Sequence, residues 1–481
     1  MRLAGGYRNR SLAKTVDWWL VACWVIMVMI GWANIYASIH STDPSSIFDW
    51  GCRSGKQFVW IMTSVGIAGL VLFVIPSRVY EGLSLPIYAG VLLLLVAVIF
   101  LGIEVKGSRS WFAFGPIRFQ PAEISKISTS LLLATVMSQL GYRIGRFKDF
   151  IITALVILVP MGIIVLQSET GSALVYVGFI FMLYREGLSG WLIFMVGMAI
   201  LLFILTISVS PYVAALTLVG VASLCISLYS GRFKWWVIVC IPLIALFAFL
   251  PGLFALIPGL SSFNPLWLLL GVTVLALPVV AFQAFRERNS FTHLAIISLL
   301  GGLLLIFSAD FLFNDVLQDH QRKRIEVLLG MKEDPSGVGY NVNQSKIAIG
   351  SGGFFGKGYL NGTQTTYGFV PEQSTDFIFC TIGEEWGFLG CTLVILLYVF
   401  LMWRIIQDAE RSREAFTRIY GYCVACCIFM HLFINIGMTI GLMPVIGIPL
   451  PFISYGGSSM WGFTAMLFIF IALDRNERKY F

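Results

Sequence analysis

The chain has 481 residues, of which 58% are hydrophobic and 12% are charged, against about 25% charged residues in an average soluble protein. A water-soluble globule cannot hide that much apolar side chain, because its surface must carry groups that water solvates. The net charge of +7 does not indicate nucleic-acid binding, since the basic residues fall in short clusters between apolar runs. The composition therefore excludes a soluble protein and predicts an all-α, polytopic membrane protein.

The first apolar run, about 15–39, is longer than the apolar region of a secretory signal peptide, which covers about 7–15 residues. No small-residue cleavage site follows it, so we expect the run to remain as a membrane anchor. The spacing of Cys423, Cys426 and Cys427 contains a Cys-x-x-Cys pattern, but within an apolar helix it favours packing over metal or redox chemistry.

A membrane-spanning helix needs about 20 apolar residues to cross about 30 Å of hydrocarbon. Fourteen such segments can be counted along the chain, at 16–38, 57–75, 86–104, 121–140, 148–166, 171–185, 190–209, 212–229, 234–256, 264–283, 291–312, 376–403, 417–440 and 451–473. The sixth is short and the join between the seventh and eighth is tight, so the count carries an error of one pair.

The distribution of Lys and Arg tests this count, because cytoplasmic joins are enriched in both. With the N-terminus in the cytoplasm, the even-numbered joins and the C-terminal tail hold clusters that include Arg78, Arg143, Arg146, Arg232, Arg286, Arg404 and Arg478. The outside joins near 169, 210, 260 and 445 hold no Lys or Arg. Both termini are therefore expected in the cytoplasm.

Two outside segments are longer than the rest, 105–120 and 313–375. The second covers about sixty residues, far above the usual connection of about 4–6, and long loops of this kind tend to be functional. It also carries positive charge that orientation alone would disfavour, which points to an anionic ligand: Arg322, Lys323, Arg324, Lys332, Lys346 and Lys357.

Two motifs in this loop suggest chemistry. The Asp-Pro-Ser-Gly-Val-Gly turn would hold Asp334 at a fixed place above the bundle. The glycine-rich run at 350–358 would offer backbone N–H groups beside Lys357, a chemistry suited to phosphate. A flexible glycine-rich loop without a ligand explains that run equally well.

The first outer loop leads into a helix that Pro121 would begin. Glu123 and Lys126 then lie three apart on one face of its first turn, and an ionisable pair at the mouth of a membrane helix is a candidate functional site. A snorkelling structural ion pair is the alternative. Trp111 could equally belong to the interfacial aromatic belt or stack against a sugar ring.

Six strings resemble the SEDS family, which includes RodA, FtsW and SpoVE, in that family's order: 107–126 (Gly-Ser-Arg-Ser-Trp to Phe-Gln-Pro-Ala-Glu-Ile-Ser-Lys), 167–173 (Gln-Ser-Glu-Thr-Gly-Ser-Ala), 334–345 (Asp-Pro-Ser-Gly-Val-Gly-Tyr-Asn-Val-Asn-Gln-Ser), 371–379 (Pro-Glu-Gln-Ser-Thr-Asp-Phe-Ile-Phe), 383–387 (Gly-Glu-Glu-Trp-Gly) and 449–459 (Pro-Leu-Pro-Phe-Ile-Ser-Tyr-Gly-Gly-Ser-Ser). The resemblance covers nearly the whole chain except about 190–290. The runs at 347–353 and 356–364 look more like the RodA branch than FtsW.

The resemblance implies a peptidoglycan polymerase of the bacterial plasma membrane, with its active site outside the cell. It would consume lipid II, form β-1,4 glycan strands in cell elongation, and work beside a class B penicillin-binding protein. The family's catalytic aspartate falls on Asp334. Substrate contacts are expected from the matched strings and from Lys346 directly after the third, at Trp111, Gln120, Glu123, Lys126, Tyr340, Gln344, Ser345, Lys346, Glu372, Asp376, Ser454 and Tyr455.

The chain departs from the family pattern in three places. Gly330-Met331 stands where an earlier Asp-Pro is usual, which removes a competing carboxylate, and Glu169 stands where aspartate is common. About four extra helices at 190–290 would join the family's ten. The expected organisation is a cytoplasmic tail (1–15), core helices (16–189), the insertion (190–290), a second core part (291–473) with the catalytic loop 313–375, and a second tail (474–481).

In the implied reaction, Asp334 would act as general base, while Lys126 and the basic loop residues would stabilise the pyrophosphate. No dedicated metal cage is visible, so the sequence indicates no definite cofactor, and a divalent cation could share the role of Lys126. Two other functions remain open. A lipid II flippase or solute exporter would need charge lining a pathway, and a scaffold for the penicillin-binding protein would leave the polar loop unexplained.

Overall fold

The computed structural model describes residues 15–40, 46–105, 107–115, 117–231, 233–256, 263–287, 290–311, 319–329 and 338–480, together with residues 313, 315, 317 and 331. The chain forms two compact units, Met1–Leu188 with Asp334–Phe481, and Ser189–Glu333.

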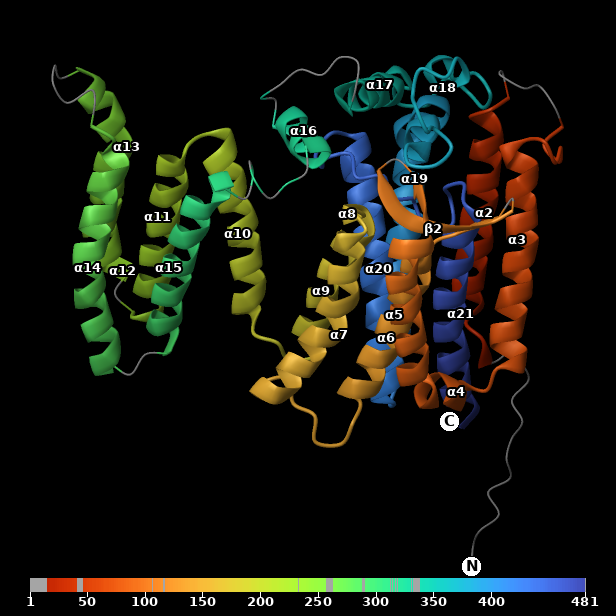
Figure 1. The fold of residues 1–481 in the computed structure, drawn as a ribbon, viewed down its shortest axis with the longest axis horizontal. Helices are drawn as coiled ribbons and strands as arrows, with labels where there is room; N and C mark the ends of the chain where they lie inside the picture. Colours follow the sequence, from red (N-terminus) through yellow and green to blue (C-terminus); the bar gives the residue numbers. More distant parts are fainter. Residues whose placement is uncertain are drawn as a thin grey trace, which may run out of the picture. The chain divides into compact units, whose positions relative to one another are not determined.

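The first unit is a helical bundle whose elements are drawn in Figure 1. Its N-terminal part comprises α2 (Trp18–Ala37), α3 (Arg53–Gly69), the π-helix η1 (Leu70–Val74), α4 (Ser77–Gly82), α5 (Ser84–Leu101), α6 (Pro121–Met137), α7 (Phe147–Leu166), α8 (Thr170–Val177) and α9 (Phe179–Arg185). Its C-terminal part comprises α17 (Val338–Ser351), α18 (Thr363–Thr366), α19 (Ile378–Arg411), α20 (Ala415–Thr439) and α21 (Gly457–Tyr480).

The centre of the first unit is formed by α20 and α21. In each, 83% of the most apolar window is buried, against 22% for α7. Helix α20 packs against α6, α9, α19 and α21, and fully buried aromatic side chains such as Tyr176, Tyr420 and Phe470 fill the contacts. A helix surrounded by protein can carry polar residues that lipid would exclude, and α6 and α20 do so.

The segment expected as a plain outer loop forms a small antiparallel sheet, in the order β1 (Ile103–Val105), β2 (Ser108–Phe114) and β3 (Ile117–Phe119). Trp111 pairs with Ile103, and Phe112 pairs with Phe119. The all-α class of the fold is confirmed, and this short sheet is an addition where the sequence predicts a loop. Aromatic residues in β2 and β3 favour strands, and β2 is tied to the bundle by the Arg109 N–H, which donates to the Gln167 carbonyl over 3.3 Å.

The second unit comprises α10 (Gly190–Ser208), α11 (Pro211–Tyr229), α12 (Phe233–Trp235), η2 (Trp236–Cys240), α13 (Ile241–Leu256), α14 (Pro265–Glu287), α15 (Ser290–Phe311) and α16 (Asp319–Leu328). A small apolar core joins α10, α11 and α15 through residues such as Leu202, Leu218 and Leu299. Only between 6% and 33% of its spanning windows are buried, so these helices offer large apolar surfaces to their surroundings.

Twelve helices in the described part of the chain are long and apolar enough to span a membrane. The two expected spans that do not meet this measure are α6 and the pair α8–α9. The hydroxyl residues of α6, which include Ser125, Ser128 and Thr129, lower its hydropathy and are buried inside the unit. The last expected span also begins too early, because 451–456 is a loop and α21 starts at Gly457.

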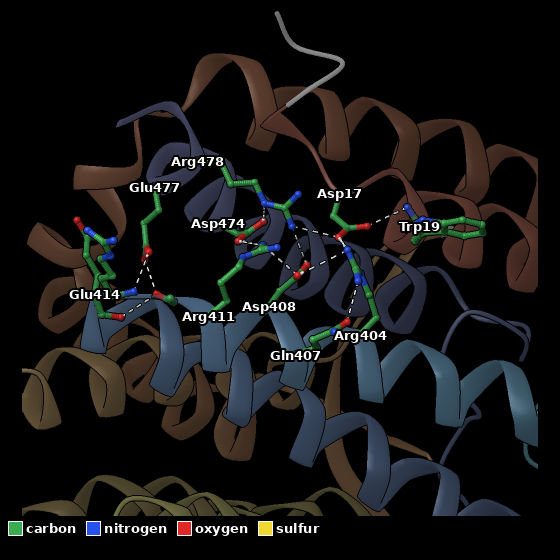
Figure 2. A network of polar contacts seen from close by, with 12 residues as sticks. Asp17, Trp19, Arg404, Gln407, Asp408, Arg411, Glu414, Asp474, Glu477 and Arg478 are labelled. Atoms are coloured by element: carbon green, nitrogen blue, oxygen red, sulfur yellow. Dashed lines mark hydrogen bonds and ion pairs between the residues drawn. The ribbon is translucent and has the colours of Figure 1, made fainter. Parts of the chain in front are cut away.

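A charged network joins the start of α2 to the ends of α19 and α21 (Figure 2). Asp17 caps α2 by accepting from the Trp19 N–H, and its other carboxylate oxygen accepts from Arg404 and Arg478. Arg478 also bonds Asp408 at 3.1 Å. The network holds three helix ends together at the end of the unit that carries the C-terminus (Figure 1).

Candidate functional site

A buried cation lies at the start of α6. Lys126 and Glu123 are 1% and 3% exposed, and their side chains pair at 2.9 Å, three residues apart as the sequence predicts. The pair does not snorkel to a surface. The Lys126 ammonium is 2.8 Å from Nε2 of His431 in α20 and 4.7 Å from the centre of the Phe463 ring. The ammonium is therefore surrounded by protein groups.

His431 links this ion pair to the loop before α21. Because the Lys126 ammonium can only donate, Nε2 of His431 accepts and its Nδ1–H donates to the Pro449 carbonyl over 3.0 Å. One turn along α20, Asn435 donates to the carbonyls of Asp376 and Ile448, at 2.8 Å each. Helix α20 thus anchors both loops that carry the matched motifs.

The two loops are also bonded to each other. Ser454 donates to the Thr375 carbonyl over 2.6 Å, and the Tyr455 N–H donates to the Ser374 carbonyl over 2.9 Å. Arg53, at the start of α3, donates to the Ser374 hydroxyl over 2.6 Å. Burial raises the pKa of Tyr455 above its usual range, against the opposing effect of Arg53.

Glu372 lies in the first of these loops with a left-handed backbone, at φ 54°. Few residues other than glycine take this conformation without an external constraint, and such positions cluster at functional sites. Its carbonyl accepts from the N–H groups of Thr375 and Phe377. The tight turn places Asp376 beside Gly447 of the second loop.

Gln120 and Glu169 form a second polar contact beside the start of α6. The Gln120 amide donates to the Glu169 carboxylate, and Ser172 in α8 donates to the same oxygen at 2.5 Å. The Glu169 carboxylate is therefore held at the start of α6. Glu169 replaces the aspartate that is common in the family, and this replacement keeps the negative charge.

Helix α17 holds four of the predicted substrate residues. Ser345 is fully buried and donates to the Thr439 carbonyl at 2.6 Å, so it fastens α17 to α20. Lys346 is exposed and its ammonium lies close to Gly441, while Tyr340 and Gln344 are partly buried. Lys346 is thus available to a ligand at this end of the bundle, and Ser345 is not.

The glycine-rich run does not form an open phosphate loop. The N–H groups of Lys357 and Gly358 donate to the carbonyls of Glu384 and Glu385, at 3.0 Å each. A Cβ on Gly356 would lie 2.1 Å from the Glu385 carbonyl oxygen, so the glycine permits backbone-to-backbone packing. The segment at Gly356 also packs against Gly387 of α19. Gly387 has φ 65° and marks a kink in that helix.

Glu384 holds this packed segment in place. Its carboxylate accepts from the N–H groups of Thr363, Gln364 and Thr365, at 2.7–2.9 Å. Lys357 completes the set at 2.6 Å. The predicted phosphate-binding role of Lys357 is therefore wrong for this arrangement, because an internal carboxylate already neutralises the lysine.

The predicted residues do not all meet in one cluster. Glu123, Lys126, Gln120, Ser454, Tyr455 and the turn at 372–376 belong to the connected set of α6, α20 and the two loops, whereas Trp111 lies partly exposed on β2. Asp334 lies outside the described residues. In the part of the chain that the structure describes, no group of three or more His, Cys, Asp or Glu residues could hold a metal ion.

Sequence reasoning missed His431, Asn435, Arg53 and Glu384. His431 and Asn435 lie four apart within an apolar run, and polar residues on one face of a membrane helix are a signal of function or tight packing. Glu384 was visible in the Gly-Glu-Glu-Trp-Gly string, but its partners are about twenty residues away and no local spacing predicts them.

This arrangement defines a class of protein: a multi-pass membrane protein whose polar motifs are gathered at one end of a helical bundle. The chain belongs to the FtsW/RodA/SpoVE family, described as cell cycle proteins, whose model matches residues 16–219 and 214–479.

Similar curated proteins carry enzyme names. The chain is 30% identical over 423 residues to the peptidoglycan glycosyltransferase MrdB of Escherichia coli K12, covering 86% of this chain and 85% of that protein. It is 31% identical to the peptidoglycan glycosyltransferase RodA of Treponema pallidum, covering 96% and 98%. A probable FtsW of Neisseria gonorrhoeae is 28% identical, covering 96% and 84%.

Solved structures share the fold. A chain from a peptidoglycan synthase complex, described as coordinating polymerization and crosslinking, superposes with a TM-score of 0.60 at 25% identity, covering 97% of this chain and 99% of that one. The rod shape determining protein RodA of Thermus thermophilus superposes with a TM-score of 0.55 at 23% identity, covering 96% and 97%.

Proposed function

We propose that this protein is a peptidoglycan glycosyltransferase that polymerises lipid II at the outer face of a bacterial plasma membrane, in the elongation role of the RodA branch. The observation that carries the proposal is the cluster of Glu123, Lys126 and His431 beneath the two motif loops, in a chain whose relatives of nearly full length are peptidoglycan glycosyltransferases. The strings at 347–353 and 356–364 favour the RodA branch, although an FtsW relative has a similar sequence identity of 28%.

The reaction joins the 4-hydroxyl oxygen of an acceptor lipid II to the anomeric carbon of a lipid-linked donor chain. The bond from that carbon to the pyrophosphate breaks, the pyrophosphate leaves on its undecaprenyl chain, and the hydroxyl proton goes to a base. Asp334 is our candidate for that base, a role that contributes about 10²–10⁴-fold in rate.

The basic groups would hold the departing pyrophosphate. Lys346 is exposed at this end of the bundle, so it can meet the phosphates directly. Lys126 already contacts Glu123 and His431, and would have to exchange one of them to contact a phosphate. We therefore assign Lys126 first to positioning α6 and the loop at 449, and second to the substrate.

The membrane topology belongs to the same proposal. With α6 and the pair α8–α9 counted as spans, the chain crosses the membrane fourteen times, with ten core spans and four inserted ones at 190–290. Both termini are then cytoplasmic and the loop 313–375 is outside. A class B penicillin-binding protein is the expected partner, in keeping with the synthase complex that contains a chain of the same fold.

A transporter is the strongest competing function. Charges that line a translocation path should be accessible to solvent along it, whereas Glu123, Lys126 and His431 are 3%, 1% and 0% exposed and pair with one another. The buried charges thus support a sealed site more than a path. A scaffold role leaves the ordered polar loops without a purpose.

Purified protein with labelled lipid II tests the proposal. We expect glycan strands to form with or without moenomycin, which should not inhibit this class of polymerase. A folded protein that moved lipid II across vesicles but formed no glycan would overturn the enzyme and leave the flippase.

A further inference from the structure

A polar pocket of about 430 Å³ lies at the end of the first unit that carries the C-terminus. It is formed by η1, the start of α4 and the last turns of α21, with Ser77, Arg78, Arg475 and Asn476 among its lining residues. Its size falls in the usual range of small-molecule sites, about 300–1,000 Å³. It belongs to a different end of the bundle from the motif loops (Figure 1).

The pocket arises where α3 loses its regular hydrogen bonding. The helix widens into η1, in which the Ile75 N–H reaches back to the Leu70 carbonyl, and Pro76 then ends it. This leaves the Leu72 carbonyl for Arg475, whose Nη1 donates to it over 2.6 Å. Such bulges occur frequently at functional sites.

Two arginines of this pocket have no carboxylate partner among the residues that the structure describes. Nearby Asp474 pairs instead with Arg411 and Arg478, at 3.0 and 2.7 Å. Within the described ranges, neither Arg78 nor Arg475 forms an ion pair, and the Leu72 carbonyl takes one of the five donors of Arg475. Two guanidinium groups at one polar pocket therefore retain donors and charge for an anion.

The rim of the pocket is apolar. Phe73 and Val74 are 62% and 70% exposed, and the Arg475 guanidinium lies 5.4 Å from the centre of the Phe73 ring. Exposed apolar side chains beside unpaired arginines match a molecule with a charged head and hydrocarbon chains.

We propose that this pocket binds the phosphate group of an anionic phospholipid, with Arg78 and Arg475 on the phosphate and the acyl chains along Phe73 and Val74. In the topology proposed above, this end of the bundle lies at the cytoplasmic leaflet, whose anionic lipids attract basic groups. The site is separate from the proposed polymerase site and does not depend on that activity.

Binding of a fluorescent phosphatidylglycerol to the full-length protein in non-ionic detergent tests this site, by anisotropy. Unlabelled dioctanoyl phosphatidylglycerol, dioctanoyl phosphatidylcholine and glycerol 3-phosphate serve as competitors. We expect only the first to compete strongly. Arg78→Gln and Arg475→Gln should each weaken binding about fivefold, the effect of about one basic group near an anionic surface.

Arg143→Gln is the matched control, since it removes an exposed charge from another join expected at the same membrane face. It should leave binding unchanged, and Arg475→Lys should retain most of it. Equal loss in Arg143→Gln would show attraction to general surface charge and overturn the site. Equal competition by glycerol 3-phosphate would show a free-phosphate site. Equal competition by phosphatidylcholine, which carries a phosphate but no net charge, would show that the pocket does not select anionic lipids; either result overturns the proposal.

Discussion

At the scale of single residues, the site depends on how the charge of Lys126 is stabilised when only 1% of its side chain is exposed. The charge of Lys126 is balanced by Glu123, and its remaining protons reach His431 and the face of Phe463. Removing one partner of a buried pair leaves the other charge uncompensated, which costs about 3–5 kcal/mol. The pair therefore makes α6 sensitive to either substitution.

We expect Lys126→Met to destabilise the protein by about 3–5 kcal/mol, because Glu123 is left as a buried charge. The Lys126→Met/Glu123→Gln double variant should recover much of that loss, as measured by thermal unfolding in detergent. If Lys126 also contacts pyrophosphate, the double variant should stay poorly active with a raised KM for lipid II. Full recovery of activity would limit Lys126 to a structural role.

Asp334→Asn tests the proposed base with little change in size. Polymerisation should fall by about two to four orders of magnitude, the range for losing a general base, while expression and folding are maintained. The measurement is glycan formation from labelled lipid II. Asp315→Asn and Asp319→Asn, in the same loop but outside the matched motif, are controls that should cost much less. Near-normal synthesis by Asp334→Asn would refute the mechanism.

At the scale of elements, the sequence indicated most of the helices because each has about 20 apolar residues with basic residues near alternate joins. Hydropathy failed to predict a helix whose surface is covered by other helices and not by lipid. Helix α6 is polar yet buried, and its contact with α20 cannot be read from hydropathy. The sheet at 103–119 escaped notice because its strands are short and joined by turns within a segment treated as loop.

The candidate site could be predicted only in part, for a similar reason. Glu123 and Lys126 are three residues apart, so helical geometry brings them together without further information. His431 meets Lys126 across 305 positions of sequence, and only the packing of α6 on α20 creates that contact. The glycine-rich run misled because spacing alone does not say whether its N–H groups face a ligand or another segment.

The network in Figure 2 makes a prediction about acid stability. Burial alone would raise the pKa of Asp17, but hydrogen bonds with Arg404, Asp408 and Arg478 outweigh it and lower the pKa from 3.8 to about 2. A lowered pKa in the folded state gives stability that is present above about pH 4 and is lost as the pH falls toward 2.

Acid unfolding of the wild type and Asp17→Asn measures this contribution. The wild type should lose stability between about pH 4 and pH 2, and the variant, already less stable at pH 7, should change less over that interval. Asp49→Asn, in an exposed turn outside the network, serves as the control and should follow the wild type. An unchanged slope in Asp17→Asn would contradict the role of the network.

At the scale of the whole molecule, the alternating charge pattern predicts the topology. A reporter fused after Arg413 should be found in the cytoplasm, and one inserted near Gly362 should be found outside, since an odd number of proposed spans separates them. Accessibility of single cysteines to an impermeant reagent provides the measurement. Both reporters on the same side would refute the fourteen-span count.

The clamp between Asp17, Asp408 and Arg478 also bears on how the protein is made. Asp17 precedes α2 and Arg478 lies in the last turn of α21, so during synthesis the contact between them forms only after nearly the whole chain has been translated and inserted. A nascent chain that stops before α21 leaves Asp17 and Asp408 without Arg478. Completion of the bundle and completion of this network are thus one event, and a product truncated before α21 should be degraded by membrane proteases faster than the full chain.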